Sequence, residues 1–107
     1  MSVQLLWAVV RPERKPQVVQ RLEAEGFYSV TEMLVYGRGK QRGIQVGAAI
    51  YDELAKTMLV LAVEEDRCQQ AIHAIQEEAH TGHPGDGKIF VQPVGQVFTV
   101  RTGQPEL

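Results

Sequence analysis

The chain has 107 residues, the size of one ordinary domain, and 44% of them are hydrophobic, which suffices for a single core and argues against disorder. Its formal net charge of −2 argues against a bulk attraction to nucleic acid, and its one cysteine, Cys68, excludes a disulfide framework. The N-terminal residues lack a basic segment with a cleavage site, and no apolar run approaches the ~18 residues of a membrane span. We therefore expect residues 1–107 to form one soluble, cytoplasmic domain that is not a membrane protein.

A strand, a helix and a second strand are predicted in the first third of the chain. Residues 5–10 form a nearly continuous apolar run, typical of a buried strand, which Arg11-Pro12 ends. The apolar residues of 18–22 fall on one face of a helix, and Gly26 is a plausible stop. Residues 27–36 are rich in β-branched and aromatic side chains and predict the second strand.

A long connection, residues 37–53, follows the second strand. It contains four glycines and the cations Arg38, Lys40 and Arg42. Loops longer than ~12–15 residues are usually functional or disordered. Nucleic-acid binding is disfavoured, because no aromatic residues are interleaved and no wider basic face accompanies the cations. Two interpretations remain: a solvated loop without a ligand, or an adaptable loop that binds a partner or an anion.

The second half of the chain repeats the strand–helix–strand order. Residues 56–63 predict a strand, and a helix follows in which apolar side chains recur at helical spacing from Cys68 to Ala79. Cys68 lies on that stripe and is expected to be a small core residue rather than a reactive thiol. Residues 89–94 predict the fourth strand, and residues 97–100 a short fifth one. The three histidines have no spacing that brings them to one metal ion.

Residues 81–91, Thr-Gly-His-Pro-Gly-Asp-Gly-Lys-Ile-Phe-Val, lie between the second helix and the fourth strand. Gly85 and Gly87 can adopt positive φ, and successive backbone N–H groups in such a turn can surround an anion. Lys88 adds a point charge at the start of the strand. This pattern predicts a phosphate cradle, although a helix C-cap followed by a tight turn explains the same residues.

The element order predicts an α+β fold, the ferredoxin-like βαββαβ sandwich, with a long flexible loop between strands two and three. Two helices would cover one face of an antiparallel sheet. Because the strands are apolar along most of their length, we expect subunit association to cover the other face.

The run at 81–91 resembles the signature of the PII nitrogen-signalling family, and the resemblance extends over nearly the whole chain. The further matching segments are Arg11-Pro12, Val30-Thr31-Glu32, Gly37-Arg38, the six residues from Tyr51 to Lys56, and Arg101-Thr102-Gly103.

The resemblance implies a trimer of ferredoxin-like subunits that binds ATP or ADP in the clefts between them. The implied nucleotide-binding residues are Ser29, Arg38, Gly85, Asp86, Gly87, Lys88 and Arg101, with Ser29 replacing a threonine near the adenine. Gln41 resembles the loop glutamine that helps to hold Mg²⁺ and 2-oxoglutarate, and Lys56 the lysine that pairs with a carboxylate of 2-oxoglutarate. The implied effectors are therefore ATP or ADP, Mg²⁺ and 2-oxoglutarate.

The chain also departs from common PII sequences. The loop carries an apparent Gly39-Lys40 insertion, its remainder is shorter, and Tyr51 does not align with the tyrosine that some members modify. Thr99 replaces a second arginine. These departures are similar to the nitrogenase-associated PII subgroup, in which two paralogous subunits inhibit dinitrogenase by direct binding, and 2-oxoglutarate with ATP relieves the inhibition.

The resemblance implies a non-enzymatic nitrogen sensor, either a homotrimer or a mixed oligomer with a paralogous subunit, and nitrogenase is the expected target. One alternative target is an ammonium transporter or a nitrogen-metabolism enzyme. An alternative of another class is a ferredoxin-like, ATP-hydrolysing enzyme, for which Asp86 is the only carboxylate near the cradle. A trimer that binds no ligand is the remaining alternative.

Overall fold

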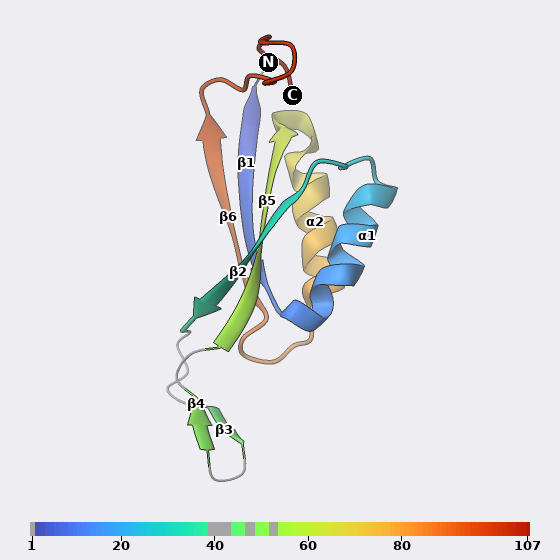
Figure 1. The fold of residues 1–107 in the computed structure, drawn as a ribbon. Coiled ribbons are helices and arrows are strands. Elements are labelled where there is room, and N and C mark those ends of the chain that lie inside the picture. Colours follow the sequence, from blue (N-terminus) through green and yellow to red (C-terminus); the bar gives the residue numbers. More distant parts are fainter. Residues whose placement is uncertain (1, 39–43, 47–48, 52–53) are drawn as a thin grey trace.

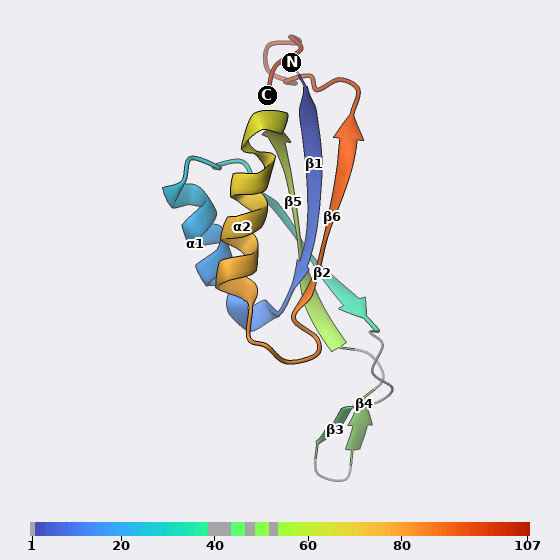
Figure 2. The same cartoon turned by 180° about the vertical axis from the view of Figure 1, so that it is seen from behind.

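The computed structural model describes residues 2–38, 44–46, 49–51 and 54–107, which form a sheet layer covered on one face by two helices (Figures 1 and 2). The four-stranded sheet is antiparallel in the order β2-β5-β1-β6. Its strands are β1 (Val3–Val10), β2 (Thr31–Gly37), β5 (Leu54–Glu64) and β6 (Gly87–Val94). The helices are α1 (Lys15–Ala24) and α2 (Cys68–Ala79), preceded by the 3-10 turns η1 (Pro12–Arg14) and η2 (Glu65–Arg67).

This topology confirms the predicted ferredoxin-like βαββαβ arrangement. The connection between β2 and β5 contains a short hairpin of β3 (Ile44–Val46) and β4 (Ala49–Tyr51), which the sequence analysis did not predict. Within the described residues, the hairpin forms a separate two-stranded sheet.

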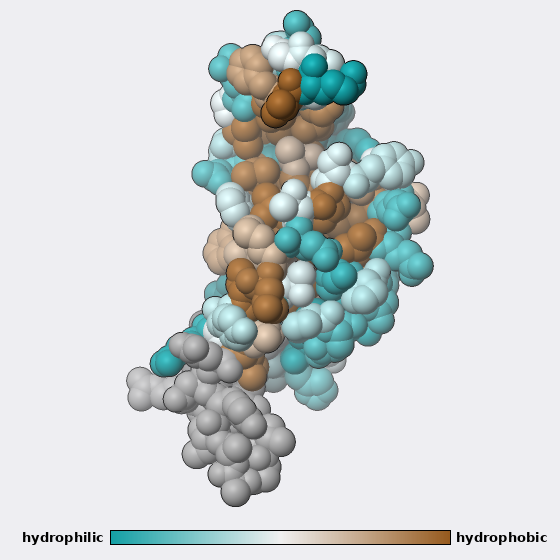
Figure 3. Space-filling view, in the orientation of Figure 1, coloured by the Kyte–Doolittle hydropathy of each residue, from teal (hydrophilic) through white to brown (hydrophobic). Residues whose placement is uncertain are grey.

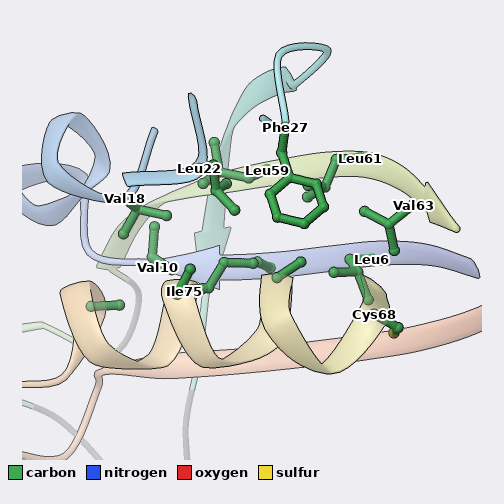
Figure 4. Packing of buried hydrophobic residues seen from close by; sticks show 14 residues of the cluster. Leu6, Val10, Val18, Leu22, Phe27, Leu59, Leu61, Val63, Cys68 and Ile75 are labelled. Atoms are coloured by element: carbon green, nitrogen blue, oxygen red, sulfur yellow. The ribbon is translucent and has the colours of Figure 1, made fainter. Parts of the chain in front are cut away.

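The core lies between the helices and the sheet. Side chains from β1, β5 and both helices meet there, among them Leu6, Val10, Leu22, Leu59 and Ile75 (Figure 4). Cys68 lies in the same layer, as predicted, and burial raises the pKa of its thiol. The thiol is therefore protonated at neutral pH, which agrees with a packing role.

The opposite face of the sheet is also apolar. Because side chains alternate along a strand, the residues between the core positions point away from the helices. Trp7 and Phe90 are paired across β1 and β6 on this face, and Phe90 is 54% exposed. In Figure 3, hydrophobic residues form an interrupted band along the strands. The association expected to cover this face stays a prediction.

Two segments differ from the predicted strands. β2 begins at Thr31 rather than residue 27, because the side chain of Phe27 turns into the core, where it is 8% exposed. Residues 97–100 form no fifth strand: Phe98 makes only an isolated bridge to Pro105. The amide of Gly103 donates to the carbonyl of Thr99 at 2.7 Å, which closes a turn there instead.

Candidate functional site

The loop from His80 to Asp86 joins α2 to β6, and its end is fixed against β1. Gly87 is the first residue of β6 and has φ +114°. A Cβ at this position would lie 1.7 Å from the carbonyl oxygen of Val9, far inside any real contact. Only glycine allows this close approach of loop and strand, so the third glycine of the 81–91 run has a packing reason.

The carboxylate of Asp86 organises the loop from within. It accepts hydrogen bonds from the amides of Thr81 at 2.9 Å and Gly82 at 3.0 Å, and from the hydroxyl of Thr81. The Thr81 hydroxyl and amide, the Gly82 amide and Arg11 together hold the pKa of Asp86 well below its usual range. Asp86 is therefore ionised at physiological pH, and its charge is directed at the loop's own donors.

Arg11 joins the loop to the end of β1. Its Nε donates to Oδ1 of Asp86 at 3.1 Å, and its Nη2 donates to the carbonyl of Pro84 at 2.9 Å. The rigid guanidinium fork thus holds a side chain and a backbone carbonyl of the same loop together.

Lys56 reaches the loop from β5. Its ammonium donates to the carbonyl oxygen of Gly85, and the residue is only 7% exposed. Burial, followed by the nearby charge of Arg11, lowers the pKa of Lys56. Lys56 is paired with Val35 of β2, and its Cγ lies 3.7 Å from where a Cβ of Gly37 would be. This one side chain therefore lies between the 81–86 loop and the start of the long connection.

The predicted site residues fall into two groups. Gly85 to Lys88, Lys56 and Arg38 lie at the end of the sheet where β6 begins and β2 ends. Ser29 precedes β2, towards the opposite end, and Arg101 is an exposed residue of the turn that follows β6. The chain does not bring these two groups together. Gln41, predicted to hold Mg²⁺ and 2-oxoglutarate, lies outside the described residues.

Sequence reasoning missed the residues that shape the loop. Arg11 matched a family pattern of a basic residue before proline, with no role attached, and Thr81 was only part of the signature. The signal available was that Arg11 directly follows a strand. Its partners lie 75 and 73 positions away, and no local pattern reports such contacts.

The loop also borders a groove between α2 and β6 with a volume of about 620 Å³. Ile72, Ile89 and Val91 supply apolar walls. His80 lies at the end of the groove next to the loop, with its Nδ1 3.7 Å from Oδ2 of Asp86.

Among the helices of the described residues, none is long and apolar enough to cross a membrane.

The fold and the site define a ferredoxin-like domain. Its glycine-containing loop is bound by the side chains of Arg11 and Lys56 and lies beside a long connection between two strands. A family model described as "Nitrogen regulatory protein P-II" matches residues 3–104. The chain belongs to this P-II family of nitrogen regulatory proteins.

Relatives and a solved structure agree with this assignment. The chain is 49% identical to "Nitrogen fixation nifHD1 region GlnB-like protein 1" of Methanosarcina barkeri, over 98% of this chain and 100% of that protein. It is also 49% identical to "Nitrogen fixation nifHD region glnB-like protein 1" of Methanococcus maripaludis, over 94% and 95% of the two chains. The fold matches the crystal structure of Arabidopsis thaliana PII bound to citrate with a TM-score of 0.81 and 36% identity, over 97% of this chain and 85% of that one. The nitrogenase-associated PII-like subgroup predicted from the sequence is confirmed.

Proposed function

We propose that the protein senses nitrogen status by binding ATP or ADP and, with Mg²⁺, 2-oxoglutarate, and that the ligands set the state of the connection at 37–53. The observation that carries the proposal is the position of Lys56. It contacts Gly85 in the loop of residues 81–86, which we call the candidate phosphate loop. It also lies beside Gly37, where the long connection begins. An ammonium has three donors, and the bond to Gly85 uses one, so donors remain for a carboxylate of 2-oxoglutarate. A ligand here is placed to act on both segments.

The nucleotide site is proposed to be shared between subunits. Lys88 is the second residue of β6, and Arg101 lies beyond the other end of this strand. The stretch from Lys88 to Val94 alone spans roughly 20 Å at ~3.3 Å per residue, too far for one triphosphate to contact both cations within a chain. A trimer in which Arg101 and Ser29 of a neighbour approach Lys88 and Arg38 completes the site. The same association covers the apolar sheet face around Trp7 and Phe90.

The proposed target is dinitrogenase. The relatives from Methanosarcina barkeri and Methanococcus maripaludis are named after nifHD regions, which ties those proteins to nitrogen fixation. By this proposal the 37–53 connection contacts the target when ligands are absent, and ATP with 2-oxoglutarate releases it. Such an ordering switch requires that the ligands bind the two loop states with different affinities. A homotrimer and a mixed oligomer with a paralogous subunit both fit this scheme.

The protein is proposed to be a regulator without catalytic activity. Asp86, the carboxylate in the candidate phosphate loop, already accepts hydrogen bonds from Thr81, Gly82 and Arg11, and its lowered pKa makes it a weak base, so it is poorly suited to activate a water molecule. Steady phosphate release that disappears in Lys88→Ala would instead support the ATP-hydrolysing alternative.

Calorimetric titration of Mg²⁺–ATP with and without 2-oxoglutarate tests the proposal. Each ligand should tighten the other by about 1–3 kcal/mol, a typical coupling between linked sites. Lys56→Gln should lose the effect of 2-oxoglutarate, whereas Lys15→Gln, a matched change on α1, should keep it. Titrations in which neither ligand binds would overturn the proposal. ATP binding that ignores 2-oxoglutarate would remove the roles of Gln41 and Lys56 and leave the nucleotide site standing.

Binding of the purified protein to dinitrogenase tests the target separately. We expect a complex in the absence of effectors and its release by ATP together with 2-oxoglutarate. If the protein does not bind dinitrogenase in either condition, and a pull-down from nitrogen-fixing cells recovers an ammonium transporter, the proposed target is wrong.

A further inference from the structure

We propose that Arg11, assisted by Lys56, is a positioning residue that turns the backbone N–H groups of Gly85 and Asp86 outwards, and so builds the anion-binding surface of the loop without touching the anion. The inference rests on the proposed function, because it concerns the nucleotide site assigned there. It gives a role to the two cations that contact the loop from the side of the sheet.

Two successive carbonyls of the loop are bound by these cations. The carbonyl of Pro84 accepts from Nη2 of Arg11 at 2.9 Å, and the carbonyl of Gly85 accepts from Nζ of Lys56. The described part of the chain has no cis peptide bonds. In a planar trans peptide the C=O and the following N–H point in opposite directions. The Gly85 N–H therefore points away from Arg11, and the Asp86 N–H away from Lys56.

Neither of these N–H groups has an acceptor within the described residues, although the amides of Thr81, Gly82 and His83 each have one. Two adjacent donors on the same side of a turn form a concave site that suits a phosphate oxygen. Gly85 has φ +97°, a conformation that favours glycine, and a Cβ there would lie 3.4 Å from Nη2 of Arg11. The guanidinium of Arg11 thus lies directly beside the residue whose positive φ shapes the turn.

Arginine suits this role better than a simple charge would. The guanidinium contacts Asp86 through Nε and Pro84 through Nη2, whereas a lysine at position 11 has a single nitrogen and lacks the rigid planar fork that fixes both acceptors. Arg11→Lys therefore preserves the charge while it removes the two-point contact, which separates positioning from plain electrostatic attraction.

The test uses the full-length protein labelled with ¹⁵N, and inorganic tripolyphosphate as the probe. Backbone amide signals and affinities are compared for wild type, Arg11→Gln, Arg11→Lys and Arg14→Gln. Arg14 is the matched control, because it is a nearby arginine whose Nε donates to the carbonyl of Glu78 in α2 at 2.8 Å rather than to the loop. Each affinity is measured at low salt and at about 0.5 M salt, where the Debye length falls to a few ångströms and a purely electrostatic effect shrinks.

We expect the Gly85 and Asp86 amide signals to move on binding in wild type and Arg14→Gln. Arg11→Gln should bind about tenfold more weakly or worse, as expected when a charge-assisted contact is lost, and the ratio to wild type should persist at high salt. Arg11→Lys should recover only part of the loss. It also serves as the test variant if Arg11→Gln fails to fold, which its spectrum would reveal.

Three results overturn the inference: wild-type affinity in Arg11→Gln, a loss that disappears with salt, or Gly85 and Asp86 signals that stay still in the wild type. In each case normal coupling of ATP and 2-oxoglutarate by calorimetry would leave the proposed function standing. If the wild type binds neither tripolyphosphate nor ATP, both fall.

Discussion

The guanidinium of Arg11 and the carboxylate of Asp86, 75 positions apart in sequence, are joined by a hydrogen bond of 3.1 Å between Nε and Oδ1. The contact ties the loop before β6 to the end of β1, the strand on which β6 is paired. The carboxylate of Asp86 in turn accepts hydrogen bonds from the amides of Thr81 and Gly82. The conformation of the candidate phosphate loop is thus set by contacts within the protein, in the absence of a ligand.

The first prediction concerns the pH dependence of stability. The folded-state pKa of Asp86 lies below the unfolded value of about 3.9, so the group stabilises the native state above that pH, and the contribution is lost as pH falls towards the folded pKa. Asp86→Asn should lower the free energy of unfolding by about 1–2 kcal/mol near neutral pH, because the charged acceptor of several donors is lost. Denaturant unfolding of both proteins should show this difference.

The difference between wild type and Asp86→Asn should shrink by about pH 3, where the wild-type carboxylate no longer contributes in full. Glu13→Gln is a suitable control, because Glu13 is an exposed carboxylate of η1 near the same end of the sheet. A difference that is constant from neutral to acid pH would show that the charge of Asp86 does not stabilise the loop.

The second prediction compares Gly87, the first residue of β6, with Gly95, which directly follows this strand. Gly87→Ala forces a Cβ to 1.7 Å from the carbonyl oxygen of Val9 at positive φ, whereas a Cβ at Gly95 meets nothing within 4 Å. We expect Gly87→Ala to cost roughly 2–5 kcal/mol of unfolding free energy, from overpacking and backbone strain together, and Gly95→Ala to change it by less than about 1 kcal/mol. Equal stability of the two variants would mean that β1 and β6 separate easily, which would weaken the assignment of a fixed loop.

The sequence predicts most of this fold because its signals are local. The apolar period of α2 and the buried runs of β1 and β5 are visible in short windows, and the order of elements leaves few topologies. The preference of aromatic residues for sheets predicts a strand at Phe27, whereas in the structure its side chain is buried in the core and precedes β2. Residues 97–100 form no strand for a different reason, because the backbone hydrogen bonds of Thr99 close locally within residues 99–104.

The site was only partly predictable. Gly85, Gly87 and Lys88 stand in one run whose turn chemistry is readable, and the structure keeps them together. The contacts of Arg11 with Asp86 and of Lys56 with Gly85 depend on strand register, which a single sequence does not encode locally. The separation of Lys88 from Arg101 follows from the length of β6, which keeps the chain extended from Gly87 to Val94.

The third prediction tests the apolar sheet face. Phe90 is 54% exposed on the face opposite the helices, paired with Trp7. If partner subunits cover this face, Phe90→Glu places a charge in an apolar interface and should shift the protein from trimer to monomer at micromolar concentration. Sedimentation equilibrium measures the change. Gln69→Glu, on the exposed side of α2, is the charge-matched control and should leave the mass unaltered. An unchanged mass in Phe90→Glu would show that the face is not a subunit interface.

The fourth prediction tests whether the nucleotide site is shared between chains. Lys88→Ala removes a charge-assisted contact and should weaken ATP binding at least several-fold, and Arg101→Ala should do likewise. If Lys88 of one chain and Arg101 of its neighbour contact the same nucleotide, trimers reassembled from equal amounts of the two variants regain intact sites at about a quarter of their interfaces, by random pairing in a closed ring. Calorimetry of the mixture should then detect tight ATP sites that neither variant shows alone. Simple mixing without reassembly is the control and should show none. A reassembled mixture as weak as its parents would place the two residues in one chain's site, or remove Arg101 from the site altogether.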